Sequence, residues 1–139
     1  MFCRIASGEL RAHVVYEDDV LCAFLDRGPI RPGHTQIVPK QHVACFDEAP
    51  ADVVAKIAVL GQQLATAMKR LYRVDRVAFL FTGGDVPHLH AHIVPMHEKT
   101  DVTSRRYILD EAPTFRTLPD APEHELAETA AALLRALGR

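Results

Sequence analysis

The sequence predicts a single α+β domain in which an antiparallel sheet of about five strands packs against a long helix. Short stretches rich in β-branched and aromatic residues fill the first third of the chain, a stretch with helical apolar period follows, and two further extended stretches come after it. The links between extended stretches are short, which favours antiparallel pairing because parallel strands need a long crossover. A length of 139 residues fits one domain with an ordinary core.

Turn residues bound the strands expected in the first third. Residues 12–17 and 20–25 are apolar or β-branched, and Glu17-Asp18-Asp19 between them supplies turn chemistry. Gly-Pro and Pro-Gly pairs then break the pattern. Residues 34–38 follow as a short strand that Pro39 closes, because proline cannot donate to a ladder of hydrogen bonds.

A long helix is expected after Pro50, which suits a first helical turn, while Asp52 suits the positive end of the helix dipole. Apolar residues at steps of three and four predict its buried stripe: Val53, Ile57, Leu60, Leu64, Met68 and Leu71.

Two more strands and a second helix complete the predicted fold. Residues 76–81 and 88–94 are the strand candidates, the second ended by Pro95, and a Gly-Gly turn lies between them. After an irregular tail, Asp120 and Glu123 have the spacing of a capping box, which predicts a C-terminal helix.

Composition and charge exclude several classes of protein. Hydrophobic residues make up 48% and charged residues 24%, as in ordinary globular domains. The formal charge is -2 and only Arg105-Arg106 forms a basic cluster, so nucleic acid is not expected as a partner. The three cysteines predict neither a disulfide framework nor a metal knuckle, which fits a reducing compartment. Neither a signal peptide nor a membrane span is predicted, and we expect a cytoplasmic protein.

Three histidines alternate with apolar residues in the last expected strand. On a strand, His88, His90 and His92 share one face, while the apolar residues between them share the other and can pack on the long helix. Three imidazoles in phase argue against mere solvation. Two chemical interpretations remain, a metal site and a nucleophile that attacks phosphorus.

Attack on phosphorus follows from ordinary imidazole chemistry. A neutral imidazole has a free lone pair near pH 7. If one ring nitrogen donates to a backbone carbonyl, the other is aimed outward as the attacking atom, and the labile phosphorus–nitrogen bond lets water finish the reaction. Flanking imidazoles can donate hydrogen bonds to the charged oxygens or the leaving group.

Further motifs surround the triad. The segments Gly33-His34-Thr35-Gln36-Ile37-Val38-Pro39-Lys40-Gln41-His42, Phe24-Leu25-Asp26 and Val86-Pro87-His88 resemble the histidine-triad (HIT) superfamily. The resemblance covers a core over about residues 2–95 and leaves about 96–139 as a C-terminal extension. It implies an antiparallel sheet with flanking helices, a homodimer, no cofactor, and hydrolysis or transfer of purine nucleotides from phosphoramidates, dinucleoside polyphosphates or similar conjugates.

The same resemblance implies roles for four histidines. His90 matches the nucleophile that forms a nucleotidyl-histidine intermediate, and His92 matches the position that contacts the phosphate or the leaving group. His88 and His42 match supporting positions.

The nucleoside would be held by an acidic and an apolar group. Asp26 matches the position that accepts hydrogen bonds from ribose hydroxyls, although an aspartate there is also an ordinary turn residue. Phe2, Ile5 and Phe24 match the apolar slot for the base; core packing is the alternative interpretation, and the two are compatible.

The loop before the triad departs from the family pattern. Gly84 stands where glutamine is common, and Phe81 or Thr82 stands near the usual asparagine. Asp85 is also expected among the nucleotide-binding residues, although its carboxylate would repel a bare phosphate unless a cation or a cationic leaving group lies between them. We therefore hypothesise a preference for a nucleotide joined to an amine or another short leaving group over one joined to a long polyphosphate chain.

Two alternatives and one exclusion remain from the sequence. The chain could be a nucleotide-binding regulatory module with little catalysis, or a metal-dependent hydrolase with the triad as ligands, although no H-E-x-x-H carboxylate is present. Some bacterial relatives bind structural zinc through an N-terminal C-x-x-C. Only Cys3 is present and its partner would precede Met1, so such zinc is not expected and Cys3 is interpreted as a small buried residue.

Overall fold

The computed structural model describes residues 1–82 and 86–102, which all belong to one compact unit, Met1–Ile108. Its elements are α1 (Phe2–Ala6), β1 (Val14–Glu17), β2 (Leu21–Leu25), β3 (Thr35–Pro39), the 3-10 turn η1 (Phe46–Glu48), α2 (Ala51–Tyr72), β4 (Arg76–Phe81) and β5 (Ala91–Met96). The predicted C-terminal helix after Asp120 lies outside the described residues, and the single domain over 1–139 stays a prediction.

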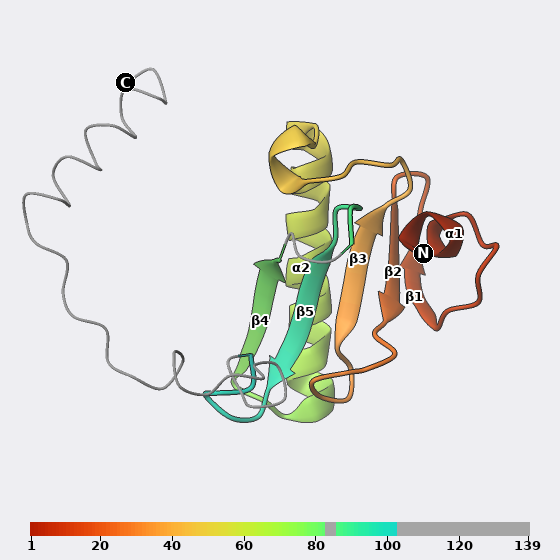
Figure 1. Cartoon of the computed structure of the whole chain (residues 1–139). Helices are drawn as coiled ribbons and strands as arrows, with labels where there is room; N and C mark the ends of the chain where they lie inside the picture. The colour runs from red at the N-terminus through yellow and green to blue at the C-terminus, as the bar shows by residue number, and fades with distance from the viewer. Residues whose placement is uncertain (83–85, 103–139) are drawn as a thin grey trace, which may run out of the picture. The chain divides into compact units, whose positions relative to one another are not determined.

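The five strands form one antiparallel sheet in the order β1-β2-β3-β5-β4 (Figure 1). The predicted α+β class and the long helix packed on the sheet are confirmed. The turn between β1 and β2 has the predicted chemistry, since Asp18 Oδ1 accepts the backbone N–H groups of Val20 at 2.7 Å and Leu21 at 2.6 Å.

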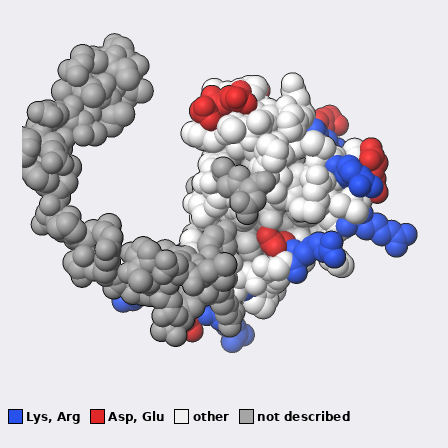
Figure 2. Space-filling view, in the orientation of Figure 1, with Lys and Arg blue, Asp and Glu red and all other residues white. Residues whose placement is uncertain are grey.

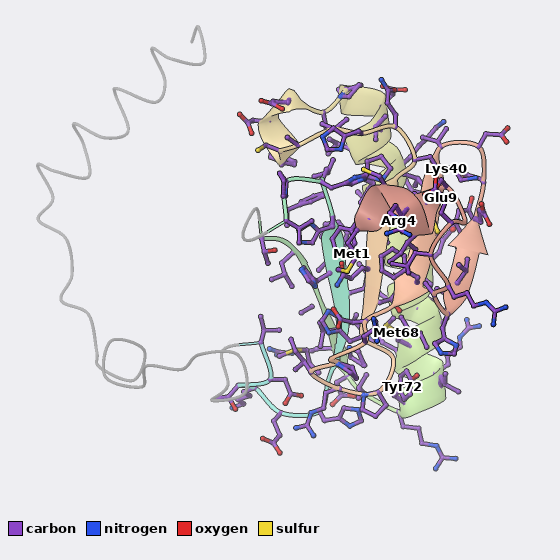
Figure 3. All side chains as sticks on the ribbon, turned by 45° about the vertical axis from the view of Figure 1, so that its right-hand side comes forward. Met1, Arg4, Glu9, Lys40, Met68 and Tyr72 are labelled. Carbon is purple, nitrogen blue, oxygen red and sulfur yellow. The ribbon has the colours of Figure 1, made fainter. Side chains whose placement is uncertain are left out.

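Alternation along the strands gives the sheet two different faces. One face packs on α2 and contains the larger cluster of buried apolar side chains: Leu21, Ala23, Ile37, Ile57, Leu60, Met68, Leu89, Ala91 and Ile93. The other, which we call the α1 face, is covered by α1 through a smaller cluster: Phe2, Ile5, Ala6, Cys22, Phe24 and Val38. Figures 1 and 3 show α1 and α2 on opposite sides of the sheet. Among the described residues, α1 is the helix that packs on this face.

Two elements differ from the sequence prediction. The helix α1 was not expected. The last strand begins at Ala91 and runs through Pro95 to Met96, whereas the pattern predicted residues 88–94. Pro95 is tolerated because β5 pairs with β4 along its length, while its pairing with β3 stops at Ile93.

The prediction that Leu71 ends the buried stripe of the long helix is also wrong. Leu71 is 72% exposed. The buried row of α2 continues instead from Met68 to Tyr72, which packs partly buried against the larger cluster. Tyr72, four positions after Met68, lies closer to the same face of the helix than Leu71, which is three positions after it.

The visible surface carries charges of both signs. On the face that Figure 2 shows, Lys and Arg occur in small groups beside Asp and Glu. Among the described residues, no helix combines the length and the apolar character that a membrane crossing requires.

Candidate active site

The three triad imidazoles gather on the α1 face where β5 begins. Phe2 of α1 packs edge-on against the rings of His88 and His90, with centroid separations of 6.2 and 5.1 Å. The rings of His90 and His92 are 5.0 Å apart. Leu89, Ala91 and Ile93, which alternate with the three histidines, belong to the cluster under α2, so the predicted division of histidines and apolar residues between two faces is confirmed.

The ring of His90 is fixed by the backbone beside it. Its Nδ1 lies 2.7 Å from the carbonyl oxygen of His88, which can only accept, so Nδ1 carries the proton. The neutral ring then has its lone pair on Nε2. This nitrogen lies 3.3 Å from the hydroxyl of Thr82. His90 is therefore held with an unprotonated nitrogen away from the strand.

His34 holds the ring of His92 in the opposite tautomer, with the proton on Nε2. The backbone N–H of Ile30 donates to Nδ1 of His34 at 3.3 Å, which leaves the proton of neutral His34 on Nε2. That Nε2 lies 2.9 Å from Nδ1 of His92 and donates to it. His92 then carries its own proton on Nε2, 3.3 Å from the same Thr82 hydroxyl.

The site thus presents a lone pair and a donor side by side. The Thr82 hydroxyl can accept a hydrogen bond from His92 and donate one to His90. A phosphoryl group could use the same pair, with its oxygen accepting from His92 and its phosphorus facing the lone pair of His90. His34 and Thr82 were not predicted as site residues. His34 stood inside a quoted motif, but nothing in its spacing indicated which ring it contacts.

Burial favours the uncharged form of His34, His88 and His92, because it lowers the pKa of each ring. Burial, together with the neighbouring His34 and His90, lowers the pKa of His92 to about 4, while Asp26 partly opposes the shift. Burial also lowers the pKa of His34 and of His88. Neutral imidazoles are the form in which this set of donors and acceptors is consistent.

A cleft of about 870 Å³ lies beside the triad, and all four predicted nucleoside-binding residues line it: Phe2, Ile5, Phe24 and Asp26. The Asp26 carboxylate is held at both oxygens, since Oδ1 accepts the N–H of Gly28 at 2.8 Å and Oδ2 accepts the side-chain amide of Gln36. Gln36 also lines the cleft and was not predicted. Asp85 lies outside the described residues.

Cys3 and His42 form a second cluster with the Nδ1 side of the His88 ring. Cys3 Sγ is 3.1 Å from Nδ1 of His88 and 3.4 Å from Nδ1 of His42, and these two nitrogens are 3.4 Å apart. Cys3 is exposed, so its interpretation as a buried residue was wrong. Phe2 and Ile5 occupy the inward face of α1, and Cys3, next along the helix, points sideways toward the histidines.

These three donors fit a tetrahedral metal. Zinc bonds of about 2.0–2.3 Å to nitrogen and sulfur place neighbouring ligands about 3.3–3.6 Å apart, close to the distances in this cluster. His88 Nε2 also donates to the carbonyl of Pro39 at 2.9 Å, the kind of contact that orients a metal-bound imidazole.

The alternative of a metal held by all three triad histidines is not favoured. Within residues 1–82 and 86–102, groups of three metal-ligating atoms place His88 with Cys3 and His42, and His92 with Asp26 and His34. The triad is divided between two clusters, and His90 belongs to neither.

Comparison with known proteins agrees with this geometry. The model of the family described as HIT domain matches residues 7–99. An uncharacterized HIT-like protein of Methanocaldococcus jannaschii is 38% identical over 102 residues, covering 70% of this chain and 79% of the relative. A protein named adenylylsulfatase HINT3 from Arabidopsis thaliana is 32% identical over 104 residues, covering 71% of this chain and 53% of the relative.

Solved structures show the same fold. A HIT family hydrolase from Legionella pneumophila has a TM-score of 0.60 at 35% identity and covers 70% of this chain and 93% of its own. A zinc-bound histidine triad family protein from Mycobacterium smegmatis has a TM-score of 0.67 at 30% identity and covers 98% of this chain and 95% of its own. The family match over most of the described residues, the relatives and the triad geometry agree, and the chain belongs to the HIT domain family.

Proposed function

We propose that this protein is a nucleotide hydrolase or transferase in which His90 attacks the phosphorus of a nucleoside monophosphate conjugate. The observation that carries the proposal is the bond from His90 Nδ1 to the His88 carbonyl, which leaves Nε2 as the free nucleophile. The donor on His92, fixed through His34, lies beside it.

The reaction would proceed in two displacements. The Nε2 lone pair of His90 forms a bond to phosphorus, and the bond to the leaving group breaks with its electron pair, the leaving group taking a proton from water. Water then attacks phosphorus, the nitrogen–phosphorus bond breaks, and His90 returns to its neutral form. Throughout, the N–H of His92 would stabilise negative charge on the phosphoryl oxygens.

The substrate class follows from the cleft and from the relatives. Phe2, Ile5 and Phe24 offer an apolar slot for a base, and Asp26 offers acceptors for a sugar. The relative named adenylylsulfatase supports an adenylyl group joined to a small leaving group. We propose adenylyl sulfate and adenosine phosphoramidates as substrates, ahead of diadenosine tetraphosphate. Faster turnover of the tetraphosphate would contradict this preference.

Trapping of the intermediate tests the chemistry. Rapid quenching with adenosine phosphoramidate should add one adenylyl group to the peptide that contains His90. His90→Ala should show neither the adduct nor turnover, whereas His97→Ala, an exposed histidine at the far end of β5, should show both. If His90→Ala turned over substrate like the wild type, the proposal would fail. Nucleotide binding without turnover in the wild type would favour a regulatory binding module.

A homodimer is proposed through the β4 edge of the sheet. β4 is an outer strand, and Phe79 on it and Phe46 beside it are 42% and 51% exposed. Apolar side chains on an open strand edge favour association. Sedimentation should give a dimer for the wild type and a monomer for Phe79→Lys; a monomeric wild type would contradict the proposal.

The cluster of Cys3, His42 and His88 supports a structural zinc ion, which would brace α1 and His88. The similar structure described as zinc-bound supports the presence of zinc in a protein of this fold. Metal analysis of the purified protein should find about one zinc per chain, because the cluster offers one set of three zinc ligands, and Cys3→Ser should lose it. Metal-free wild-type protein with an unchanged melting temperature after zinc addition would contradict this.

A further inference from the structure

Gln36 lies in the middle of the α1 face. The strand register pairs it with Phe24 of β2 on one side and His92 of β5 on the other. Neighbouring strands are about 4.8 Å apart, so Gln36 stands midway across the ~10 Å between the proposed base slot and the proposed phosphate site. The sugar of a nucleotide joins its base to its phosphate, and it would therefore pass over Gln36.

The side chain of Gln36 has an unusual hydrogen-bond state. It is 8% exposed, and its Nε2 donates to Asp26 Oδ2. Its Oε1 is buried without a partner, and it is the one side-chain atom in that state within residues 1–82 and 86–102. Buried acceptors are nearly always paired, because an unpaired one loses its water contacts without compensation. A donor supplied by a ligand would complete this set.

The neighbours of Gln36 define the chemistry of that ligand. Gly28 and Gln36 hold the carboxylate of Asp26 from the protein side, and its remaining lone pairs are free to accept. Gln36 Oε1 adds a second acceptor, which can turn toward the cleft because the terminal torsion of glutamine is broad. Two adjacent acceptors suit two adjacent hydroxyl groups.

We propose that Gln36 is a specificity-determining residue which, together with Asp26, selects nucleotides with a ribose diol over nucleotides whose sugar lacks hydroxyls. One hydroxyl donates to Gln36 Oε1 and the other to the Asp26 carboxylate. The inference rests on the proposed function, since the base slot and His92 place the sugar between them.

Calorimetric titration with AMP and with 2′,3′-dideoxy-AMP tests the inference. The wild type should bind AMP more tightly by at least about tenfold, as expected for hydrogen bonds that involve a charged partner. Gln36→Leu and Gln36→Met should lower this ratio by about tenfold and change the affinity for the dideoxy ligand by less than about twofold. Gln63→Leu, an exposed glutamine on α2, is the matched control and should behave like the wild type.

Each other outcome is decisive. An unchanged ratio in the folded Gln36 variants would overturn the role of Gln36 and leave the proposed function intact. Equal weakening of both ligands would make Gln36 a structural residue and also overturn it. If neither variant folds, equal binding of both ligands by the wild type overturns the inference and a preference for AMP upholds selection of the diol. No binding of AMP by the wild type would overturn this inference and the proposed function together.

Discussion

Arg31 and Asp101 are joined by two hydrogen bonds across 70 positions of the chain, from Nε at 2.9 Å and from Nη2 at 2.7 Å to the same carboxylate oxygen. The other oxygen of Asp101 accepts the backbone N–H groups of His97 at 2.8 Å and Glu98 at 2.9 Å. Asp101 is 3% exposed. The pair ties the loop before β3 to the turn after β5, and these strands carry the site.

Asp101→Ala should lower the free energy of unfolding by about 2–4 kcal/mol, because Arg31 loses its charge partner and two backbone N–H groups lose their acceptor. Urea unfolding measures the change. Glu98→Ala is the control: Glu98 lies 3.3 Å from Arg31 but its side chain is 70% exposed, so its loss should cost less than about 1 kcal/mol. Equal losses in the two variants would show that Asp101 does not act as a buried clamp.

Position 33 requires glycine because Tyr72 of α2 leaves no room there for a side chain. Its φ is +93°, and a Cβ there would lie 2.4 Å from Cε2 of Tyr72. Figure 3 shows Tyr72 at the C-terminal end of α2. Gly33→Ala should therefore cost several kcal/mol, since strain and overpacking each cost about 1–3 kcal/mol. Gly8→Ala has a similar φ of +79° with nothing within 4 Å, and it should cost only about 1–2 kcal/mol. Thermal melts that rank the two alike would contradict the role of Tyr72.

The sheet and α2 were predictable because their patterns of apolar residues extend over enough positions to distinguish strands from a helix. The helix α1 was not, because an isolated five-residue helix has no stability of its own. It forms where Phe2 and Ile5 are buried against the sheet, which is a tertiary effect. The same tertiary placement brings Cys3 to His42, 39 residues away, a contact that no spacing rule indicates.

The site was predictable only in part, for a similar reason. Alternation alone put the triad histidines on one face. The contact of His34 with His92 depends on where a loop ends, and the position of Gln36 beside His92 depends on the register of β3 against β5. Register is set by packing of the whole sheet. Local sequence therefore indicated the nucleophile but not the residues that orient its neighbours.

His34→Asn should lower kcat for adenosine phosphoramidate by about 10–100-fold, less than the about 10²–10³ expected when a charge-stabilising donor is removed altogether. The variant loses the bond that fixes the proton of His92 on Nε2. KM should change little, because His34 does not line the cleft. His97→Asn should keep the kcat of the wild type. A rise in KM at constant kcat would assign His34 to binding instead of positioning.

Stability should fall as the solution becomes acidic, because the buried histidines resist protonation. His92 has a pKa of about 4 in the folded protein and an ordinary value of 6.5, and it faces His34, His90 and Asp26. Below pH 6.5 the unfolded chain binds protons that the folded chain does not, so the free energy of unfolding decreases as pH falls.

The slope from His92 is about 1.4 kcal/mol per pH unit, and it adds up to about 3 kcal/mol by the time the folded-state pKa is reached. His34, whose pKa is also lowered, adds to the decrease. Urea unfolding at pH values from about 7.5 to about 4 measures it. His92→Asn should flatten the curve by about one proton, whereas replacing the exposed His97 should not. A wild-type curve with no slope below pH 6.5 would mean that these imidazoles are hydrated enough to titrate normally, and the fixed donor and acceptor assignments of the site would then have no basis.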